Sequence, residues 1–119
     1  MRDEVLLALP DTRLRALVLA QLQEEGYQVV AVPRFSHALR LLARGLRPRA
    51  VVAELEDAPE VALEGLRRSG VTVLAVAGQL DRAKAERLAV PCMLRPFTVG
   101  QLVDRVRDLV GPPRGTSSR

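Results

Sequence analysis

Three stretches of the chain are almost unbroken runs of apolar residues, at 5–9 (VLLAL), 50–53 (AVVA) and 71–77 (VTVLAVA). A strand that is covered on one face alternates between apolar and polar residues, whereas a strand covered on both faces is apolar throughout. The runs have the length of strands and are short for buried helices. They therefore predict the central strands of a parallel β-sheet that carries helices on both faces.

Further strands and helices fill the rest of the chain in alternation. The shorter or more polar stretches at 27–32 and 92–96 predict edge strands, and with them the predicted strands are 4–9, 27–32, 50–55, 71–77 and 92–96. Amphipathic segments between them predict helices over 12–24, 37–44, 60–69, 82–88 and 99–110. Residues that favour helix N-caps precede four of these helices: Asp11, Ser36, Asp81 and Thr98, the last with Gln101 as a capping box.

Alternation of strands and helices requires right-handed parallel crossovers. We therefore expect an α/β fold with a doubly wound, five-stranded parallel sheet of the flavodoxin type, in the strand order 2-1-3-4-5. The 119 residues suffice for one core. We place a single domain over residues 1–111 and a disordered basic tail over 112–119, because Gly111-Pro112-Pro113 ends the last helix and a polar segment follows.

Composition excludes several kinds of protein. The chain has one cysteine and one histidine, so a disulfide within the chain and a structural zinc site are excluded, and no apolar run has the length of a membrane span. The net charge of +4 comes from arginines that are distributed over every helix, and aromatic residues make up only 3%. We therefore expect a cytoplasmic protein without membrane attachment, and direct nucleic-acid binding is not favoured.

In a doubly wound sheet the functional crevice lies at the carboxyl ends of the strands. The segment after the first strand, LPDTRLR at 9–15, lacks the glycines that let backbone amides approach a nucleotide. This argues against an enzyme that binds a dinucleotide or a nucleoside triphosphate. The strand ends instead place Leu9, Glu54, Val76 and Arg95 around the crevice.

The sequence resembles the receiver domain of two-component response regulators from Val5 to Gly111. The resemblance rests on the segment at 5–30, on RPRAVVAEL at 47–55 and above all on MLRPFTVGQLVDRVRDLV at 93–110. There, Arg95-Pro96-Phe97 after a short strand, opening into a capped helix, is similar to the Lys-Pro junction of that family.

The resemblance implies a site that this chain has largely lost. Receivers accept a phosphoryl group on an aspartate after strand three, beside magnesium held by acids after strand one. A hydroxyl after strand four and a lysine after strand five contact the phosphoryl oxygens. The matching positions here are Leu9 and Pro10 for the paired acids, with Asp11 one residue late, Glu54 for the phosphoacceptor, Val76 for the hydroxyl, Arg95 for the lysine and Cys92 for the switch aromatic.

These replacements predict a degenerate pseudo-receiver. Leucine and proline side chains offer magnesium no oxygen, whereas the ion needs about six oxygen ligands in octahedral geometry. We therefore expect no metal, no cofactor and no enzymatic activity, and a phosphorylation-independent protein-interaction module in bacterial signalling or gene regulation. Two alternatives stay open: control of transcription through a DNA-binding partner or a missing output domain, and a small-molecule or nucleotide sensor that uses the crevice.

Several residues admit two interpretations. Glu54 could contact Arg95 and imitate the modified aspartate, or both could be solvated charges at strand ends, which is the interpretation we favour on energetic grounds. Glu56, Asp57 and Glu60 could bind a metal but more commonly precede a helix N-terminus. His37 is expected on the surface, and Cys92 is expected to be a buried, inert thiol.

Candidate interaction surfaces lie on the first and last helices. Leu19 is an apolar residue beyond the expected buried stripe of helix 12–24, and Arg105 and Arg107 are expected on the exposed face of helix 99–110. The resemblance implies homodimers through the last strand and its flanking helices. However, acids expected before strand five are Val90 and Pro91 here, so a homodimer at that face, a contact through helix 12–24 and a monomer all remain open.

Overall fold

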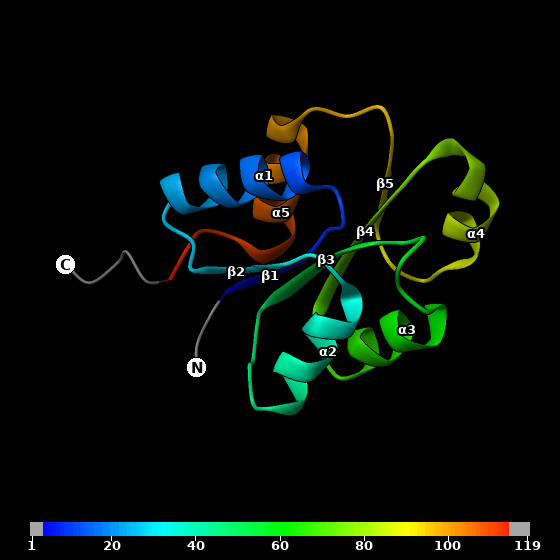
Figure 1. The fold of residues 1–119 in the computed structure, drawn as a ribbon, viewed down its shortest axis with the longest axis horizontal. Coiled ribbons are helices and arrows are strands. Elements are labelled where there is room, and N and C mark those ends of the chain that lie inside the picture. Colours follow the sequence, from blue (N-terminus) through cyan, green and yellow to red (C-terminus); the bar gives the residue numbers. More distant parts are fainter. Residues whose placement is uncertain (1–3, 115–119) are drawn as a thin grey trace.

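The computed structural model describes residues 4–114. Five strands and five α-helices alternate along the chain, with one 3₁₀ turn between β4 and α4 (Figure 1). The elements are β1 (Val5–Ala8), α1 (Thr12–Glu24), β2 (Val29–Val32), α2 (Phe35–Ala43), β3 (Ala50–Glu54), α3 (Glu60–Arg68), β4 (Thr72–Ala77), η1 (Gln79–Asp81), α4 (Arg82–Arg87), β5 (Cys92–Leu94) and α5 (Val99–Val110).

The strands form one parallel sheet in the order β2-β1-β3-β4-β5, as predicted. Helices α1 and α5 cover one face, while α2, α3 and α4 cover the other (Figure 1). Successive side chains of a strand therefore enter different cores. Leu6 and Ala8 of β1 pack with α2, α3 and α4, and Val5 and Leu7 pack with α1 and α5. This two-sided burial explains why the central strands are continuously apolar.

The edge strands confirm the same logic. Every residue of β1 is buried, whereas β2 and β5 are half-buried along their whole length. A more polar sequence is tolerated at the edges because one side of each edge strand has no neighbouring strand. Among the described residues, no helix is long and apolar enough to cross a membrane.

Helix starts follow local sequence at two places and depart from it at two. Asp11 accepts the Leu14 N–H at 2.8 Å, and Thr98 and Gln101 form the predicted capping box. Helix α2 begins at Phe35 with Arg34 as its N-cap, so the predicted start at 37 with Ser36 as cap is wrong. The helix begins earlier because the Phe35 N–H donates to the carboxylate of Asp57, from a distant part of the chain. The 3₁₀ turn η1 precedes α4, and Asp81 makes no side-chain capping hydrogen bond.

A buried carboxylate organises the edge of the sheet opposite the crevice. Glu4, only 5% exposed, accepts the Arg49 guanidinium at 3.0 Å and the Arg114 backbone N–H at 2.7 Å. Arg49 also donates to the carbonyls of Val110 and Pro112. Residues 112–114 of the predicted tail are therefore held beside the start of β1, and the remaining tail lies outside the described residues.

The Tyr27 hydroxyl adds a second attachment, because it donates to the carbonyl of Gly111 at 2.6 Å. Gly111 has a φ of 81°, a conformation that side-chain-bearing residues rarely adopt. The turn at Gly111 sends the chain from the end of α5 back towards Glu4 (red in Figure 1). We refer to Glu4, Tyr27 and Arg49 together as the exit clamp.

Candidate functional site at the carboxyl ends of the strands

Parallel register brings the predicted site residues to one edge of the sheet. Glu54 is the last residue of β3 and pairs in register with Val76 of β4. Arg95 follows β5, and its backbone N–H donates to the carbonyl of Ala77 at 2.8 Å. Leu9 follows β1, and its N–H donates to the carbonyl of Val32 at 3.1 Å. The strand ends that carry these residues therefore lie along one edge of the sheet, the edge where a doubly wound sheet places its functional crevice.

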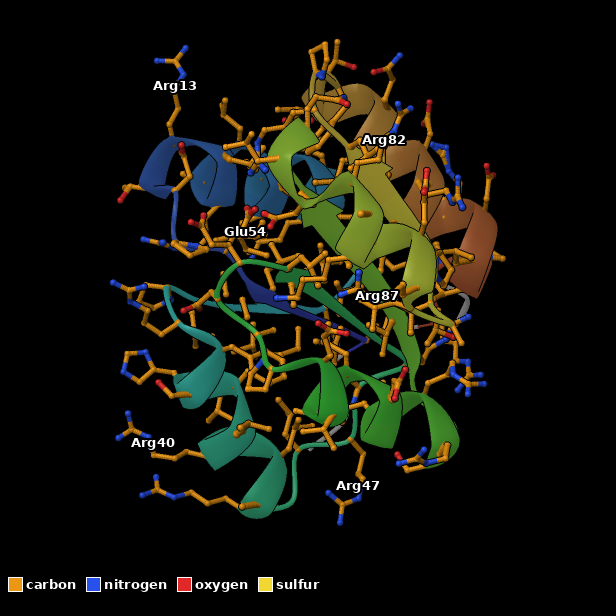
Figure 2. The ribbon with its side chains drawn as sticks, turned by 90° about the vertical axis from the view of Figure 1, so that its right-hand side faces the viewer. Arg13, Arg40, Arg47, Glu54, Arg82 and Arg87 are labelled. Carbon is orange, nitrogen blue, oxygen red and sulfur yellow. The ribbon has the colours of Figure 1, made fainter. Side chains whose placement is uncertain are left out.

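Glu54 and Arg95 form a two-pronged ion pair across this edge. Arg95 Nη2 lies 2.6 Å from Glu54 Oε1, and Nη1 lies 3.0 Å from Oε2. The Glu54 side chain is 12% exposed and that of Arg95 is 38% exposed. The interpretation favoured from the sequence, two solvated charges at strand ends, therefore does not describe Glu54, which is largely shielded from solvent. Figure 2 shows Glu54 between the blue helix α1 and the green loop that follows β3.

The electrostatics of the pair follow from this contact. The hydrogen bonding of the Arg95 guanidinium to the Glu54 carboxylate raises the pKa of Arg95, and partial burial opposes that rise. The guanidinium carbon of Arg95 also lies 5.7 Å from the centre of the Phe97 ring, within reach of a cation–π interaction. Arg95 is thus held on one side by a carboxylate and on another by an aromatic ring.

Residues at the end of β1 supply no spare carboxylate. Leu9 is fully buried, and Asp11 is engaged in capping α1. Arg15, which sequence reasoning missed, donates from Nη1 to the carbonyl of Leu9 at 2.7 Å. A cation thus lies at the strand end where the resemblance implies acids. Only its spacing of one helical turn from Asp11 could have suggested this contact.

The donor set does not fit the magnesium ion that the receiver family uses. Leu9 and Pro10 have no side-chain oxygens, and both oxygens of Glu54 accept hydrogen bonds from Arg95. Within residues 4–114, no group of three or more histidines, cysteines, aspartates or glutamates is arranged to hold a metal ion. A hard divalent cation would have to displace a guanidinium and still lack oxygen ligands.

Val76 and Cys92 complete the positions carried over from the resemblance. Val76 is fully buried in the core that faces α1 and α5, and its side chain cannot donate a hydrogen bond. Cys92 was expected to be buried, but it is only half-buried. Desolvation raises the pKa of its thiol, and the charges of Glu54 and Asp81 raise it further. The thiol therefore stays protonated at neutral pH, which agrees with an unreactive cysteine.

The acids after β3 have separate partners. Asp57 Oδ2 accepts the backbone N–H of Phe35 at 2.9 Å, and Oδ1 lies 3.4 Å from Arg34. Asp57 thereby caps α2 from a distant part of the chain, which explains why α2 begins earlier than predicted. Glu60 lies 3.9 Å from the charged groups of both Lys84 and Arg87, so it links α3 to α4.

The predicted interaction residues behave differently from one another. Leu19 packs against the core below α1 and is not a free apolar contact, whereas Leu17 is 44% exposed. The buried arc of α1 is displaced because α5 packs beside it. Arg105 is exposed, but Arg107 lies 3.6 Å from Glu25 and also contacts Asp104.

An open groove lies between β5 and α5, with a volume of about 470 Å³. Its lining includes Cys92 and Phe97 on one side and Asp104, Arg105 and Asp108 on the other. The groove is at the face through which the resemblance implies homodimers. Its lining carries charges of both signs, from Asp104, Arg105 and Asp108.

Comparison with known proteins gives the fold its context. No family model and no curated protein sequence matches the chain. Several solved structures, in contrast, match the fold of the chain. The receiver domain of a sensor histidine kinase from Pseudomonas aeruginosa, with magnesium in its active-site cleft, has a TM-score of 0.74 at 20% identity, covering 93% of this chain and 99% of that one.

Two further structures show the same likeness. An orphan response regulator of H. pylori has a TM-score of 0.76 at 16% identity, covering 92% of this chain and 96% of its own. A protein described as an adenylate cyclase from Rhodopirellula baltica has a TM-score of 0.80 at 12% identity, covering 92% of this chain and 88% of its own. The chain thus has the flavodoxin-like fold of response-regulator receiver domains.

Proposed function

We propose that this chain is a phosphorylation-independent receiver-fold module that acts in bacterial signalling by binding another protein. The single observation that carries the proposal is the closed ion pair of Glu54 and Arg95 at the position of the family's phosphoacceptor. No catalytic step is assigned to the chain. The fold supplies a stable scaffold, and signalling takes place through its surfaces.

Chemistry at the crevice supports this proposal. Transfer of a phosphoryl group to a carboxylate requires a cation that neutralises repulsion between the donor and the carboxylate. The residues after β1 offer no oxygen set for that cation, and Glu54 is one methylene longer than the aspartate of the family. The oxygen that would attack is already bound to a guanidinium at 2.6 or 3.0 Å.

The same ion pair gives the crevice a fixed state. In the family, the lysine after strand five contacts oxygens of the modified aspartate, and here Arg95 contacts oxygens of an unmodified glutamate. We infer that the contact between the ends of β3 and β5 is permanent, so a partner would meet one conformation of the chain irrespective of phosphate supply.

Phosphoryl transfer can be tested directly. The chain is incubated with acetyl phosphate and magnesium and its intact mass is measured, while a receiver that keeps its aspartate serves as the positive control. We expect no gain of a phosphoryl group, and none in the Glu54→Asp variant, because the magnesium ligands are still lacking. The mass of a phosphoryl adduct on the unmodified chain would refute the proposal.

A second measurement detects a conformational response without a covalent bond. Amide spectra of the isotopically labelled chain are recorded with beryllofluoride and magnesium, and then with magnesium alone. We expect the signals of Glu54, Val76 and Arg95 to remain unchanged. Saturable shifts at these residues would show that the crevice still binds a phosphoryl analogue, which contradicts the proposal.

A further inference from the structure

Carboxylates are distributed very unevenly along this chain. Residues 26–53 contain five arginines and the only histidine, but no aspartate or glutamate. The net charge of this segment is +5 with histidine neutral, whereas that of the whole chain is +4, so the remainder has a charge of +4 − 5 = −1. Although arginines occur on every helix, residues 26–53, which include α2, therefore carry more positive charge than the chain has in total.

The fold neutralises two of these five arginines. Arg49 is paired with Glu4 at 3.0 Å, and Arg34 lies 3.4 Å from Asp57. The other three, Arg40, Arg44 and Arg47, are exposed and form no ion pair within residues 4–114.

The three unpaired arginines lie at one end of α2. Arg40 and Arg44 are one helical turn apart and share a face, and Arg47 follows the helix and donates to the backbone carbonyls of Leu42 and Leu46. Figure 2 shows the labelled Arg40 and Arg47 directed outward from this end, far from Arg13 on α1. A helix C-terminus favours cations, but it does not provide the counter-charges that three neighbouring guanidinium groups attract.

Apolar side chains accompany these cations. Leu39 is 40% exposed and is one of four large apolar residues that are exposed among the described residues. Ala43, one turn further along, is also exposed, so an apolar strip runs beside Arg40 and Arg44. We call Leu39, Arg40, Ala43, Arg44 and Arg47 the α2 basic surface.

We infer that the α2 basic surface binds an acidic, amphipathic segment of a partner protein, in which carboxylates flank an apolar side chain. Carboxylates of such a segment would pair with the guanidinium groups, and its apolar residue would cover Leu39. A nucleic-acid backbone would satisfy the arginines but would leave the apolar strip exposed. The inference rests on the proposed function, because it names the class of partner that the module would bind.

The experiment uses the full chain, labelled for amide spectroscopy, and a synthetic helical peptide with leucines one turn apart and flanking glutamates. A peptide with glutamine for every glutamate and a DNA duplex are the comparison ligands. We expect the acidic peptide to shift residues 35–47 and the glutamine peptide to leave them unshifted. Arg40→Glu with Arg44→Glu should weaken binding by about tenfold or more, since two attractive pairs become repulsive.

A matched variant controls for net charge. Arg13 and Arg105 are exposed and form no ion pair in the described part of the chain, and their helices α1 and α5 lie on the other face of the sheet. Arg13→Glu with Arg105→Glu changes the net charge equally and should leave peptide binding within about twofold. Arg40→Gln with Arg44→Gln gives a milder variant if charge reversal prevents folding, and Leu39→Ala should weaken binding several-fold.

Three outcomes would overturn the inference: no shift at residues 35–47, equal loss of affinity in the control variant, or tighter binding of the duplex at the same residues. Each titration is repeated with beryllofluoride and magnesium. A shift of the Glu54 amide signal with beryllofluoride would contradict phosphorylation independence alone. If the acidic peptide does not bind and Glu54 does not respond to beryllofluoride, only the inference on the α2 basic surface is contradicted.

Discussion

The ion pair between Glu54 and Arg95 permits a quantitative prediction. Its two hydrogen bonds are 2.6 and 3.0 Å long, and the side chains are 12% and 38% exposed. Fully exposed pairs contribute about 0–1 kcal/mol, while removal of one member of a buried pair costs about 3–5 kcal/mol. Because this pair is intermediate in exposure, we expect Arg95→Met to lower the free energy of unfolding by about 2 kcal/mol.

Substitution of the acidic partner, Glu54, should lower the free energy of unfolding by less. In Glu54→Gln the amide oxygen can still accept one hydrogen bond from Arg95, and Arg95 is exposed enough to be partly hydrated. We expect a loss of about 1 kcal/mol. The double variant leaves neither charge unpaired, so the two losses should not add, and the coupling free energy should be about 1 kcal/mol.

Urea unfolding followed by far-ultraviolet circular dichroism measures all four proteins of this cycle. Concentrated salt should reduce the coupling only partly, because Glu54 is shielded from solvent. Additive losses within about 0.3 kcal/mol would show that the two side chains do not interact in solution. That result would remove the observation on which the closed crevice depends.

Three further predictions concern other contacts. Burial raises the pKa of Tyr27, so the contribution of its hydroxyl to stability is complete below pH 10 and is lost as the pH rises through the raised pKa. We expect Tyr27→Phe to abolish this loss of stability at alkaline pH. Because the variant lacks the hydrogen bond to Gly111, it should also lower the free energy of unfolding by about 1 kcal/mol in urea titrations at neutral pH. Asp57→Ala removes the acceptor of the Phe35 N–H and should cost about 1 kcal/mol, with faster amide exchange in the first turn of α2. The Cys92 thiol, whose pKa is raised by burial, should react with iodoacetamide more slowly than a free peptide thiol at pH 8; equal rates would contradict the observed burial.

Local sequence sufficed for the sheet and for those helix ends whose caps lie within three residues. The continuous apolar runs at β1, β3 and β4 could be predicted to be central strands because burial on both faces permits no alternation. Asp11 and the capping box at Thr98 act on neighbouring backbone groups. Such interactions join residues that are three positions apart in the chain, so they can be predicted from the sequence alone.

Contacts between distant segments explain what could not be predicted. The start of α2 depends on Asp57, 22 residues after Phe35, and the fate of the tail depends on Glu4, 110 residues before Arg114. Glu4 resembles an ordinary polar residue before a strand, so nothing in its neighbourhood indicates a buried ion pair. Leu19 was misassigned because the packing of α5 against α1 rotates the buried arc of the helix.

At the candidate site, residue types were predictable but their state was not. Glu54 and Arg95 could be placed at adjacent strand ends from the fold alone, yet their contact depends on side-chain conformations that spacing does not determine. Similarly, the unpaired arginines of the α2 basic surface could be recognised only after Arg34 and Arg49 had been assigned their partners.

The exit clamp has a practical consequence for experiments. Tyr27 and Glu4 hold the backbone at Gly111 and Arg114 on the rim of the sheet opposite Glu54. Strand β3 spans five residues, about 17 Å at 3.3 Å per residue, so a fluorophore or affinity handle joined after Arg114 starts that far from the crevice. Sensors mounted there should leave beryllofluoride titrations of the crevice undisturbed, whereas dyes at the opposite rim would obstruct them.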